Sequence, residues 1–269
     1  MSIKMIAIDM DGTLLDPNQQ LTAETIKTVK EAKTHGIKIV LCTGRPLTGL
    51  AQFFGPLGLV EPGDYAITYN GAMVQHADTK EILLQHSLSY DDFADLTALA
   101  DRLNVHSHAE DADYMYTPNA DISKYSVRES YLVNMPMFYR LPDQFPHDKQ
   151  FAKVMFIDDP DILAAATAKI PADYFERYYF VNSEPFFLEA LNKNASKGNA
   201  VTDLAQKLGY SMDEVMAIGD QANDLPMIKA AGCGVAMGNA IDEVKAHAQV
   251  ITATNAENGV AKAIQQYAF

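Results

Sequence analysis

The sequence predicts an α/β protein in which a Rossmann-like parallel sheet is interrupted by an inserted α+β unit. Short apolar, β-branched runs alternate with amphipathic stretches toward both ends of the 269-residue chain, and this alternation is typical of βαβ units. From about residue 84 the alternation gives way to short strands mixed with helices, with a high density of Tyr and Phe. We therefore expect a core domain of residues 1–83 and 192–269, and an inserted domain at residues 84–191.

The first elements indicate why the sheet should be parallel. Ile6-Ala7-Ile8 is short, apolar and β-branched, which predicts a buried strand. A helix is expected at residues 21–33, with Thr22 as its N-cap and Gly36 just beyond its end. Residues 37–42 form a second, nearly continuous apolar run. Strand, helix and strand in this order make a βαβ unit, whose two strands are parallel.

The remaining elements follow from the same periodicities. A short helix is expected at residues 47–54 and a strand at 65–69, after which Asn70-Gly71 predicts a tight turn and a hairpin. The inserted domain should contain helices at 91–103, 122–133 and 161–169, and strands at 105–109, 114–117, 154–157, 178–181 and 185–188. The βα alternation then returns, with helices at 197–208, 225–231, 242–248 and 260–266, and strands at 215–218, 234–237 and 250–251.

Composition limits the classes of partner. The chain has 21 basic and 35 acidic residues, a net charge of −14, whereas a nucleic-acid-binding surface needs clustered Lys and Arg. We see no transmembrane run and no signal peptide, and Cys42 and Cys233 make neither a disulfide framework nor a zinc pattern. We therefore expect a soluble cytoplasmic enzyme with two buried free thiols, binding neither nucleic acid nor membrane.

Asp9 and Asp11 stand two positions apart directly after the first strand, and Gly12 lets the chain turn sharply. Two carboxylates at a strand exit repel each other and are costly to desolvate. A nearby cation would relieve both costs. Taken alone, the stretch is explained equally well by a solvated Asp-Gly turn and by a binding site.

Polar clusters at three strand exits favour the binding site. These clusters are Asp9/Asp11/Thr13, Thr43/Gly44/Arg45 and Asp220/Asn223/Asp224. The carboxyl ends of parallel strands meet at one edge of a sheet, so the three clusters can converge there. Carboxylates suit Mg²⁺, a hard cation that takes oxygen ligands. The Thr43 hydroxyl, the amides around Gly44 and the amine of Lys197, which begins a predicted helix, suit phosphate oxygens.

These motifs resemble those of the haloacid dehalogenase superfamily phosphatases, and in particular the Cof-type, YidA-like sugar phosphatases of subfamily IIB. The first motif, DxDGT, matches residues 9–13, and the second matches Thr43-Gly44-Arg45. The third matches Lys197-Gly198, and the fourth, GDxxND, matches residues 219–224. The resemblance covers essentially the whole chain. It implies a parallel-sheet core with an inserted cap domain of the C2B kind, which sets substrate specificity.

The resemblance also implies a role for each matched residue. Asp9 would be the nucleophile that forms an aspartyl-phosphate, and Asp11 would protonate the leaving group and then deprotonate water. Mg²⁺ would be bound by the carboxylates of Asp9 and Asp220 and the backbone carbonyl of Asp11, with Asp224 as supporting or water-mediated ligand. The phosphate and substrate would be held by Met10 through its backbone N–H, Thr43, Gly44, Arg45, Lys197 and Asn223.

The resemblance implies a Mg²⁺-dependent phosphatase that hydrolyses small phosphorylated metabolites, with sugar phosphates as the expected class. A phosphomutase on the same core is an alternative, and product analysis on a hexose phosphate would separate the two. A receiver-type phospho-acceptor is a further alternative, but Asp11 and the inserted domain favour turnover. The expected partner is a small phosphorylated molecule, and the protein should be a monomer or a homodimer.

Three other patterns are given simpler explanations. Asn70 could touch the substrate, although a plain turn is favoured. His106 and His108 could be two metal ligands, but with no third ligand in view we expect solvent-facing histidines. Five aromatic residues of the inserted domain are expected mainly in its core, with one or two lining the substrate pocket: Tyr114, Tyr116, Tyr125, Tyr131 and Phe138.

Overall fold

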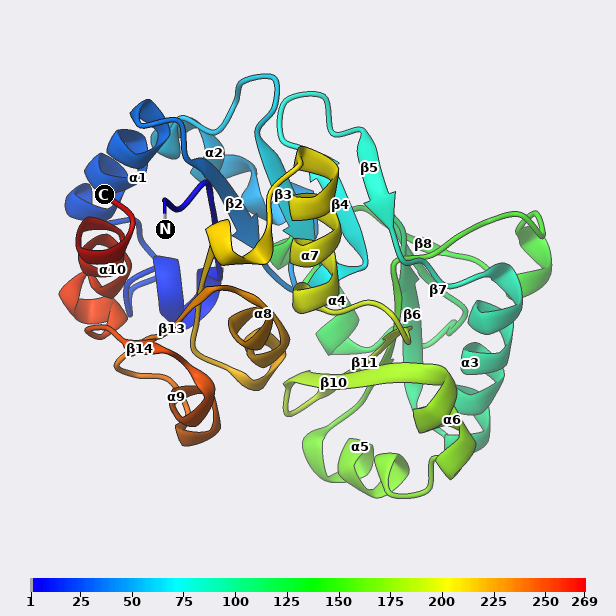
Figure 1. Ribbon diagram of the computed structural model, residues 1–269. Helices are drawn as coiled ribbons and strands as arrows, with labels where there is room; N and C mark the ends of the chain where they lie inside the picture. The colour runs from blue at the N-terminus through cyan, green and yellow to red at the C-terminus, as the bar shows by residue number, and fades with distance from the viewer. Residues whose placement is uncertain (1) are drawn as a thin grey trace. The chain divides into compact units, whose positions relative to one another are not determined.

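The structure is a computed structural model that describes residues 2–269 (Figure 1). The chain divides into a core unit, formed by the residues up to Gln85 and by Ser196–Phe269, and an inserted unit, His86–Ala195. The first boundary was predicted after residue 83 and lies after residue 85, two residues later. The second was predicted after residue 191 and lies after residue 195, four residues later. The difference arises because β5 (Ile82–Gln85) pairs in the core sheet, whereas β11 (Phe187–Asn192) pairs in the inserted unit.

Within the described residues, the core sheet has eight strands in the order β14-β13-β12-β1-β2-β3-β4-β5. The pairs from β14 to β3 are parallel, and β4 and β5 add two antiparallel strands. Their bounds are β1 Met5–Ile8, β2 Lys38–Cys42, β3 Tyr65–Thr68, β4 Met73–His76, β12 Val215–Gly219, β13 Cys233–Ala236 and β14 Val250–Ile251. The predicted parallel α/β core is therefore confirmed, and β1 lies between β2 and β12.

Helices cover both faces of the core sheet (Figure 1). Alternate side chains of β1 explain this arrangement, because Ile6 and Ile8 join an apolar cluster with α1 and α10, while Met5 and Ala7 join a second cluster with α7. The helices of this unit are α1 Ala23–Thr34, α2 Ala51–Leu57, α7 Lys197–Leu208, α8 Leu225–Ala230, α9 Asp242–His247 and α10 Gly259–Tyr267.

Three local predictions are confirmed in the core unit. The Thr22 hydroxyl accepts a hydrogen bond from the backbone N–H of Thr25 at 3.1 Å and caps α1. The chain leaves this helix through Gly36, whose φ of +79° lies in the left-handed region. Asn70 and Gly71 also have positive φ, and the strands on either side of them, β3 and β4, pair as an antiparallel hairpin.

The inserted unit has its own sheet, with the order β10-β11-β9-β6-β7-β8 among the described residues. Its further strands are β6 His106–Glu110, β7 Met115–Thr117, β8 Met137–Tyr139, β9 Lys153–Ile157 and β10 Tyr178–Glu184. Its helices are α3 Tyr90–Leu103, α4 Lys124–Leu132, α5 Pro160–Thr167 and α6 Ala172–Arg177. β8 and α6, both of which are short, were not predicted from the sequence. One face of this sheet packs apolar side chains against α3 and α5.

The other face of this sheet buries four ionisable side chains. His108, Glu110, Lys153 and Glu189 are at most 3% exposed. The Lys153 amine lies 3.5 Å from a Glu110 carboxylate oxygen and 3.4 Å from one of Glu189. His108 contacts Glu110 at 3.1 Å and the Ser126 hydroxyl of α4 at 3.1 Å. The expectation of a solvent-facing histidine is therefore wrong for His108, because Glu110 of the same strand and Ser126 of α4 supply the hydrogen bonds that water would otherwise make.

Glu129 of α4 interacts electrostatically with this cluster, and its replacement tests that interaction. Burial raises the pKa of Glu129 to about 7, with Lys153 opposing the rise and Glu110 and Glu189 adding to it. A raised carboxyl pKa stabilises the fold fully below the unfolded-state value near 4.5, and this contribution is lost as the pH rises through about 7. We expect the difference in melting temperature between Glu129→Gln and the wild type to grow in the variant's favour from pH 4.5 to about 7 and then to level off.

A thermal unfolding series over this pH range measures that difference. Glu176→Gln on α6 makes the same chemical change at an exposed site of the same unit and serves as the control. If Glu129→Gln gave a constant difference, Glu129 would not be coupled to the buried charges.

The expectation that the five aromatic residues lie mainly in the core is wrong. Tyr131 is 86% exposed, Tyr114 42% and Phe138 39%, and Tyr116 and Tyr125 are half-buried. Tyr131 lies on α4, whose only buried residue among those described is Ser126. Tyr114, Tyr116 and Phe138 lie at or beside β7 and β8, and β8 is the edge strand of this sheet among the described residues.

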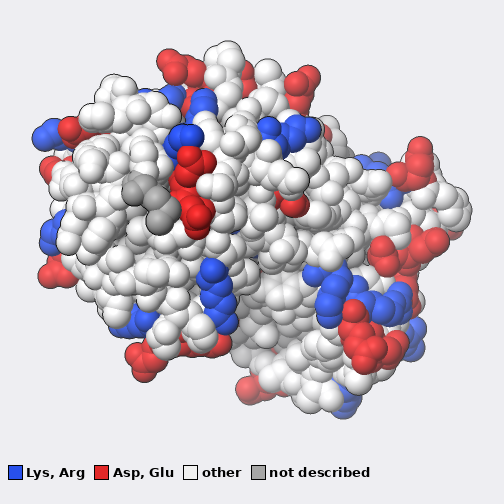
Figure 2. All heavy atoms as spheres, in the orientation of Figure 1, with Lys and Arg blue, Asp and Glu red and all other residues white. Residues whose placement is uncertain are grey.

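On the face shown in Figure 2, basic side chains occur in small groups next to acidic ones, without a continuous basic surface. Cys42 is buried and Cys233 half-buried, and both are free thiols. Among residues 2–269, no helix combines the length and the apolar character needed to cross a membrane.

Candidate active site

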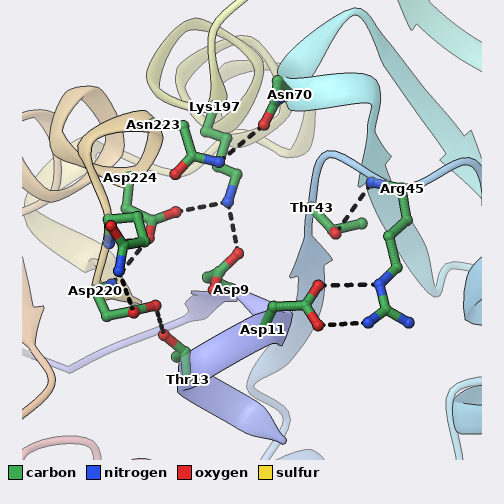
Figure 3. Close-up of polar contacts among 11 residues, drawn as sticks. Asp9, Asp11, Thr13, Thr43, Arg45, Asn70, Lys197, Asp220, Asn223 and Asp224 are labelled. Atoms are coloured by element: carbon green, nitrogen blue, oxygen red, sulfur yellow. Dashed lines mark hydrogen bonds and ion pairs between the residues drawn. The ribbon is translucent and has the colours of Figure 1, made fainter. Parts of the chain in front are cut away.

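The three polar clusters converge at the carboxyl edge of the core sheet (Figure 3). Asp9 follows β1 directly, and its backbone N–H donates to the carbonyl of Ile218 on β12 at 3.0 Å. Thr43 follows β2, where its backbone N–H donates to Ile67 of β3 at 2.9 Å. Asp220 follows β12. Because β2, β1 and β12 are adjacent and parallel, their exits place these side chains together.

Lys197 joins two carboxylates at the start of α7. Its amine lies 2.6 Å from Asp9 Oδ1 and 2.6 Å from Asp224 Oδ1, and the lysine side chain is fully buried. Burial lowers the pKa of Lys197, but Asp224 and Asp9 outweigh that effect and hold the pKa above its usual value. Burial and the Asp224 charge raise the pKa of Asp9, against the lowering effect of Lys197. The amine therefore stays charged beside Asp9.

The two aspartates after β12 are held by different partners. Asp220 Oδ1 accepts from the Thr13 hydroxyl at 2.8 Å, and its Oδ2 accepts from the Gln221 amide at 3.1 Å. Asp224 Oδ2 accepts from the backbone N–H groups of Asp220 and Gln221, at 2.8 and 3.0 Å. Gln221 falls at an unspecified position of the fourth motif, so the motif alone does not predict its contact with Asp220.

Asp9, Asp220 and Asp224 can each offer one oxygen within 4.8 Å of the others, and all three are buried. Hard cations such as Mg²⁺ bind oxygen ligands of this kind. This is the set of carboxylates that fits a divalent cation among the described residues. The Asp11 carboxylate is not part of this set, because it faces Arg45 (Figure 3).

Two glycines allow the close approach of backbone segments around this site. Gly12 has φ of +78°, and a Cβ there would lie 2.6 Å from Asp220 Oδ2. Gly71 has φ of +96°, and a Cβ there would lie 2.1 Å from the carbonyl oxygen of Ser196, directly before Lys197. A side chain at Gly71 would therefore displace the segment that positions the lysine.

The other predicted residues line the same region. Thr43 is buried, and its hydroxyl accepts from the backbone N–H of Arg45 at 3.2 Å. The Asn223 amide donates to the Asn70 side-chain oxygen at 3.0 Å. Asn70 thus belongs to the predicted turn and also touches a site residue. The Met10 side chain is buried in the apolar core, so it faces away from the site.

Arg45 contacts Asp11 with two nitrogens of its guanidinium. Nε donates to Asp11 Oδ2 at 2.9 Å, and Nη2 donates to Oδ1. The same Nη2 donates to the Gln19 side-chain oxygen at 3.0 Å. No sequence motif indicates Gln19, because only the loop conformation after Asp16 brings it to Arg45.

Comparison with known proteins gives consistent similarities. A model of the haloacid dehalogenase-like hydrolase family matches residues 6–264. The Bacillus subtilis protein YxeH, which carries a provisional phosphatase name, is 50% identical over 98% of this chain and 97% of its own length. A second B. subtilis protein, the 5-amino-6-(5-phospho-D-ribitylamino)uracil phosphatase YcsE, is 34% identical over 98% and 96%. The crystal structure of a haloacid dehalogenase-like hydrolase from Bacteroides thetaiotaomicron superposes with a TM-score of 0.87 at 30% identity, covering 98% and 99%.

Proposed function

Because this chain belongs to the haloacid dehalogenase-like hydrolase family and is a phosphatase of its Cof type, we propose that it is Mg²⁺-dependent and hydrolyses small phosphorylated metabolites through an aspartyl-phosphate. The observation that carries the proposal is the group at the edge of the core sheet. There the Asp9 carboxylate lies 2.6 Å from the Lys197 amine, next to Asp220 and Thr43.

In the first step, an Asp9 oxygen attacks phosphorus and the bond from phosphorus to the leaving oxygen breaks, while Asp11 gives that oxygen a proton. In the second step, Asp11 takes a proton from water as the water oxygen attacks phosphorus. The bond between phosphorus and the Asp9 oxygen breaks, which restores the Asp9 carboxylate and releases inorganic phosphate. Phosphoryl transfer depends mainly on positioning and charge stabilisation, and the buried Lys197 supplies fixed positive charge next to Asp9.

We assign the phosphate oxygens to Thr43, the amide of Gly44, Lys197, Asn223 and the backbone N–H of Met10. The Thr43 hydroxyl already accepts one hydrogen bond, so its own proton is available to an anion. Asn223 is oriented by Asn70. Arg45 differs from these residues because its guanidinium is engaged by Asp11.

The buried oxygens of Asp9, Asp220 and Asp224 support Mg²⁺ as the cofactor. Asp9 and Asp220 would be direct ligands, together with the backbone carbonyl of Asp11. One Asp224 oxygen accepts from two backbone N–H groups and the other accepts from Lys197. These contacts support the assignment of Asp224 as a water-mediated ligand or as a residue that holds the direct ligands in place. Bound Mg²⁺ would supply positive charge against the phosphate and the clustered carboxylates.

Sugar phosphates are the proposed substrate class, with the inserted unit setting specificity. The name of YcsE, which is 34% identical, refers to a phosphorylated sugar-alcohol derivative, and this supports a small phosphorylated polyol or sugar. The net charge of −14 argues that an anionic substrate is bound by local groups such as Lys197, not by a general attraction.

A panel of phosphorylated metabolites tests this proposal by the release of inorganic phosphate. We expect sugar phosphates to be hydrolysed faster than nucleotides or phosphoserine. Activity should disappear when divalent cations are chelated and return with Mg²⁺, whereas Ca²⁺, which prefers more ligands at longer distances, should restore less. Full activity in the presence of the chelator would contradict the cofactor assignment.

A further inference from the structure

Arg45 and Asp11 form a two-point contact. This contact directs the guanidinium at a carboxylate of the protein and not at a phosphate. The guanidinium presents its Nε and Nη2 to the two oxygens of one carboxylate. Such paired contacts fix the plane and direction of a carboxylate as well as its charge. Asp11 is 48% exposed as a side chain, so packing alone does not hold it.

The backbone of Arg45 is fixed on both sides. Its N–H donates to the Thr43 hydroxyl at 3.2 Å, and its carbonyl accepts from the Tyr69 N–H at 3.2 Å. The position of the guanidinium is therefore determined by the turn after β2 and by the neighbouring hairpin.

Gln19 accepts a hydrogen bond from the same Nη2 that contacts Asp11. It lies in a tight loop where one Asp16 carboxylate oxygen accepts from the N–H groups of Asn18 and Gln20, at 2.8 and 2.9 Å. Gln19 itself has φ of +60°, which non-glycine residues adopt infrequently. This conformation accompanies the 3.0 Å contact from Arg45 Nη2 to the Gln19 side-chain oxygen.

We propose that Arg45 is a positioning residue for the general acid Asp11, and that Gln19 holds Arg45 in place for this task. The inference rests on the proposed phosphatase mechanism and assigns a role to a residue that the motif alone places among the substrate ligands. During proton transfer one Asp11 oxygen turns to the leaving oxygen, while the other stays on the guanidinium. The proton passes from Asp11 to that oxygen as its bond to phosphorus breaks.

The dependence on the leaving group distinguishes this role from phosphate binding. An alkyl leaving group needs a proton from Asp11, whereas 4-nitrophenolate departs without one. We compare kcat/KM, which reports the step up to loss of the leaving group, for 4-nitrophenyl phosphate and for the alkyl phosphate hydrolysed fastest in the panel. Arg45→Ala should lower kcat/KM for the alkyl ester by roughly 10- to 100-fold, as expected for a misplaced acid. It should lower kcat/KM for the aryl ester by less than about threefold.

Arg45→Lys and Gln19→Ala sharpen this comparison. Lysine keeps the charge but loses the two-point contact, so it should reproduce the leaving-group pattern of Arg45→Ala. Gln19→Ala should shift the ratio of the two esters in the same direction but less. The inhibition constant of inorganic phosphate should change by less than about twofold in all three variants, since no phosphate ligand is removed. Thermal unfolding shows that each variant is folded.

Equal losses for both esters, with weaker inhibition by inorganic phosphate and rescue by Arg45→Lys, would overturn the inference and make Arg45 a phosphate ligand. A wild-type protein that hydrolyses no ester in the panel would instead contradict the proposed function itself. These outcomes are distinguishable, because the first needs an active wild type. Gln19→Ala alone decides the matter if neither Arg45 variant folds, since an unchanged ratio of the two esters would contradict the inference.

Discussion

Asp9→Asn is expected to abolish phosphate release, with turnover reduced by about 10⁵-fold or more, as when an enzyme loses its nucleophile. Asparagine keeps the shape of the side chain and an oxygen that can accept from Lys197. It lacks the carboxylate needed to form an aspartyl-phosphate. Inorganic phosphate release and the mass of the protein after mixing with substrate measure the loss of turnover and of the phospho-enzyme.

Two variants serve as controls for this result. Asp242→Asn changes an exposed aspartate in the first turn of α9 and should leave turnover unchanged. Asp11→Asn should also lose turnover, but with an activated leaving group it should still accumulate phospho-enzyme, because Asp9 remains. An active Asp9→Asn protein would overturn the assignment of the nucleophile.

Lys197→Met is expected to lower the free energy of unfolding by about 3–5 kcal/mol, the range found when one partner of a buried ion pair is removed. The amine is fully buried and lies 2.6 Å from both Asp9 and Asp224. Methionine fills a similar volume but leaves two buried carboxylates without this counter-charge. Urea unfolding at neutral pH measures the change, and turnover should fall as well because the phosphate would lose a cation.

Lys207→Met on the same helix provides the matched control. Lys207 is exposed in the last turn of α7, and its replacement should change the free energy of unfolding by less than about 0.5 kcal/mol. A loss below about 1 kcal/mol for Lys197→Met would indicate that the two carboxylates are neutralised by other means.

Much of the core unit could be predicted from the sequence, because each of its central strands is a short apolar run followed by a polar motif. A parallel sheet brings consecutive exits to one edge, so the meeting of Asp9, Thr43 and Asp220 followed from topology. The hairpin at Asn70-Gly71 followed from local turn chemistry.

The inserted unit was harder to predict, for a physical reason. Its sheet has one apolar face and one face that buries charges. A buried lysine is tolerated only when partners surround it, and the partners of Lys153 come from two other strands, β6 and β11. Such pairings are set by strand register and leave no periodic pattern in the sequence.

In the active-site region, the motifs identified the groups but not how these groups orient one another. The contacts of Gln19 with Arg45 and of Gln221 with Asp220 depend on the path of two loops. Both residues lie in positions where many side chains would suit a loop equally well. Their contacts became visible only once the backbone geometry was known.

The strand order of the core also sets a sequence of events during synthesis. β1 pairs with β2, which is made soon after it, and with β12, which is made only after the whole inserted unit. On the ribosome the inserted unit is thus complete, with its own sheet, while one edge of β1 still has no neighbour. An open apolar strand edge is a template for association with other chains. The arrangement that brings Asp220 next to Asp9 therefore leaves an apolar strand edge open to other chains during this interval.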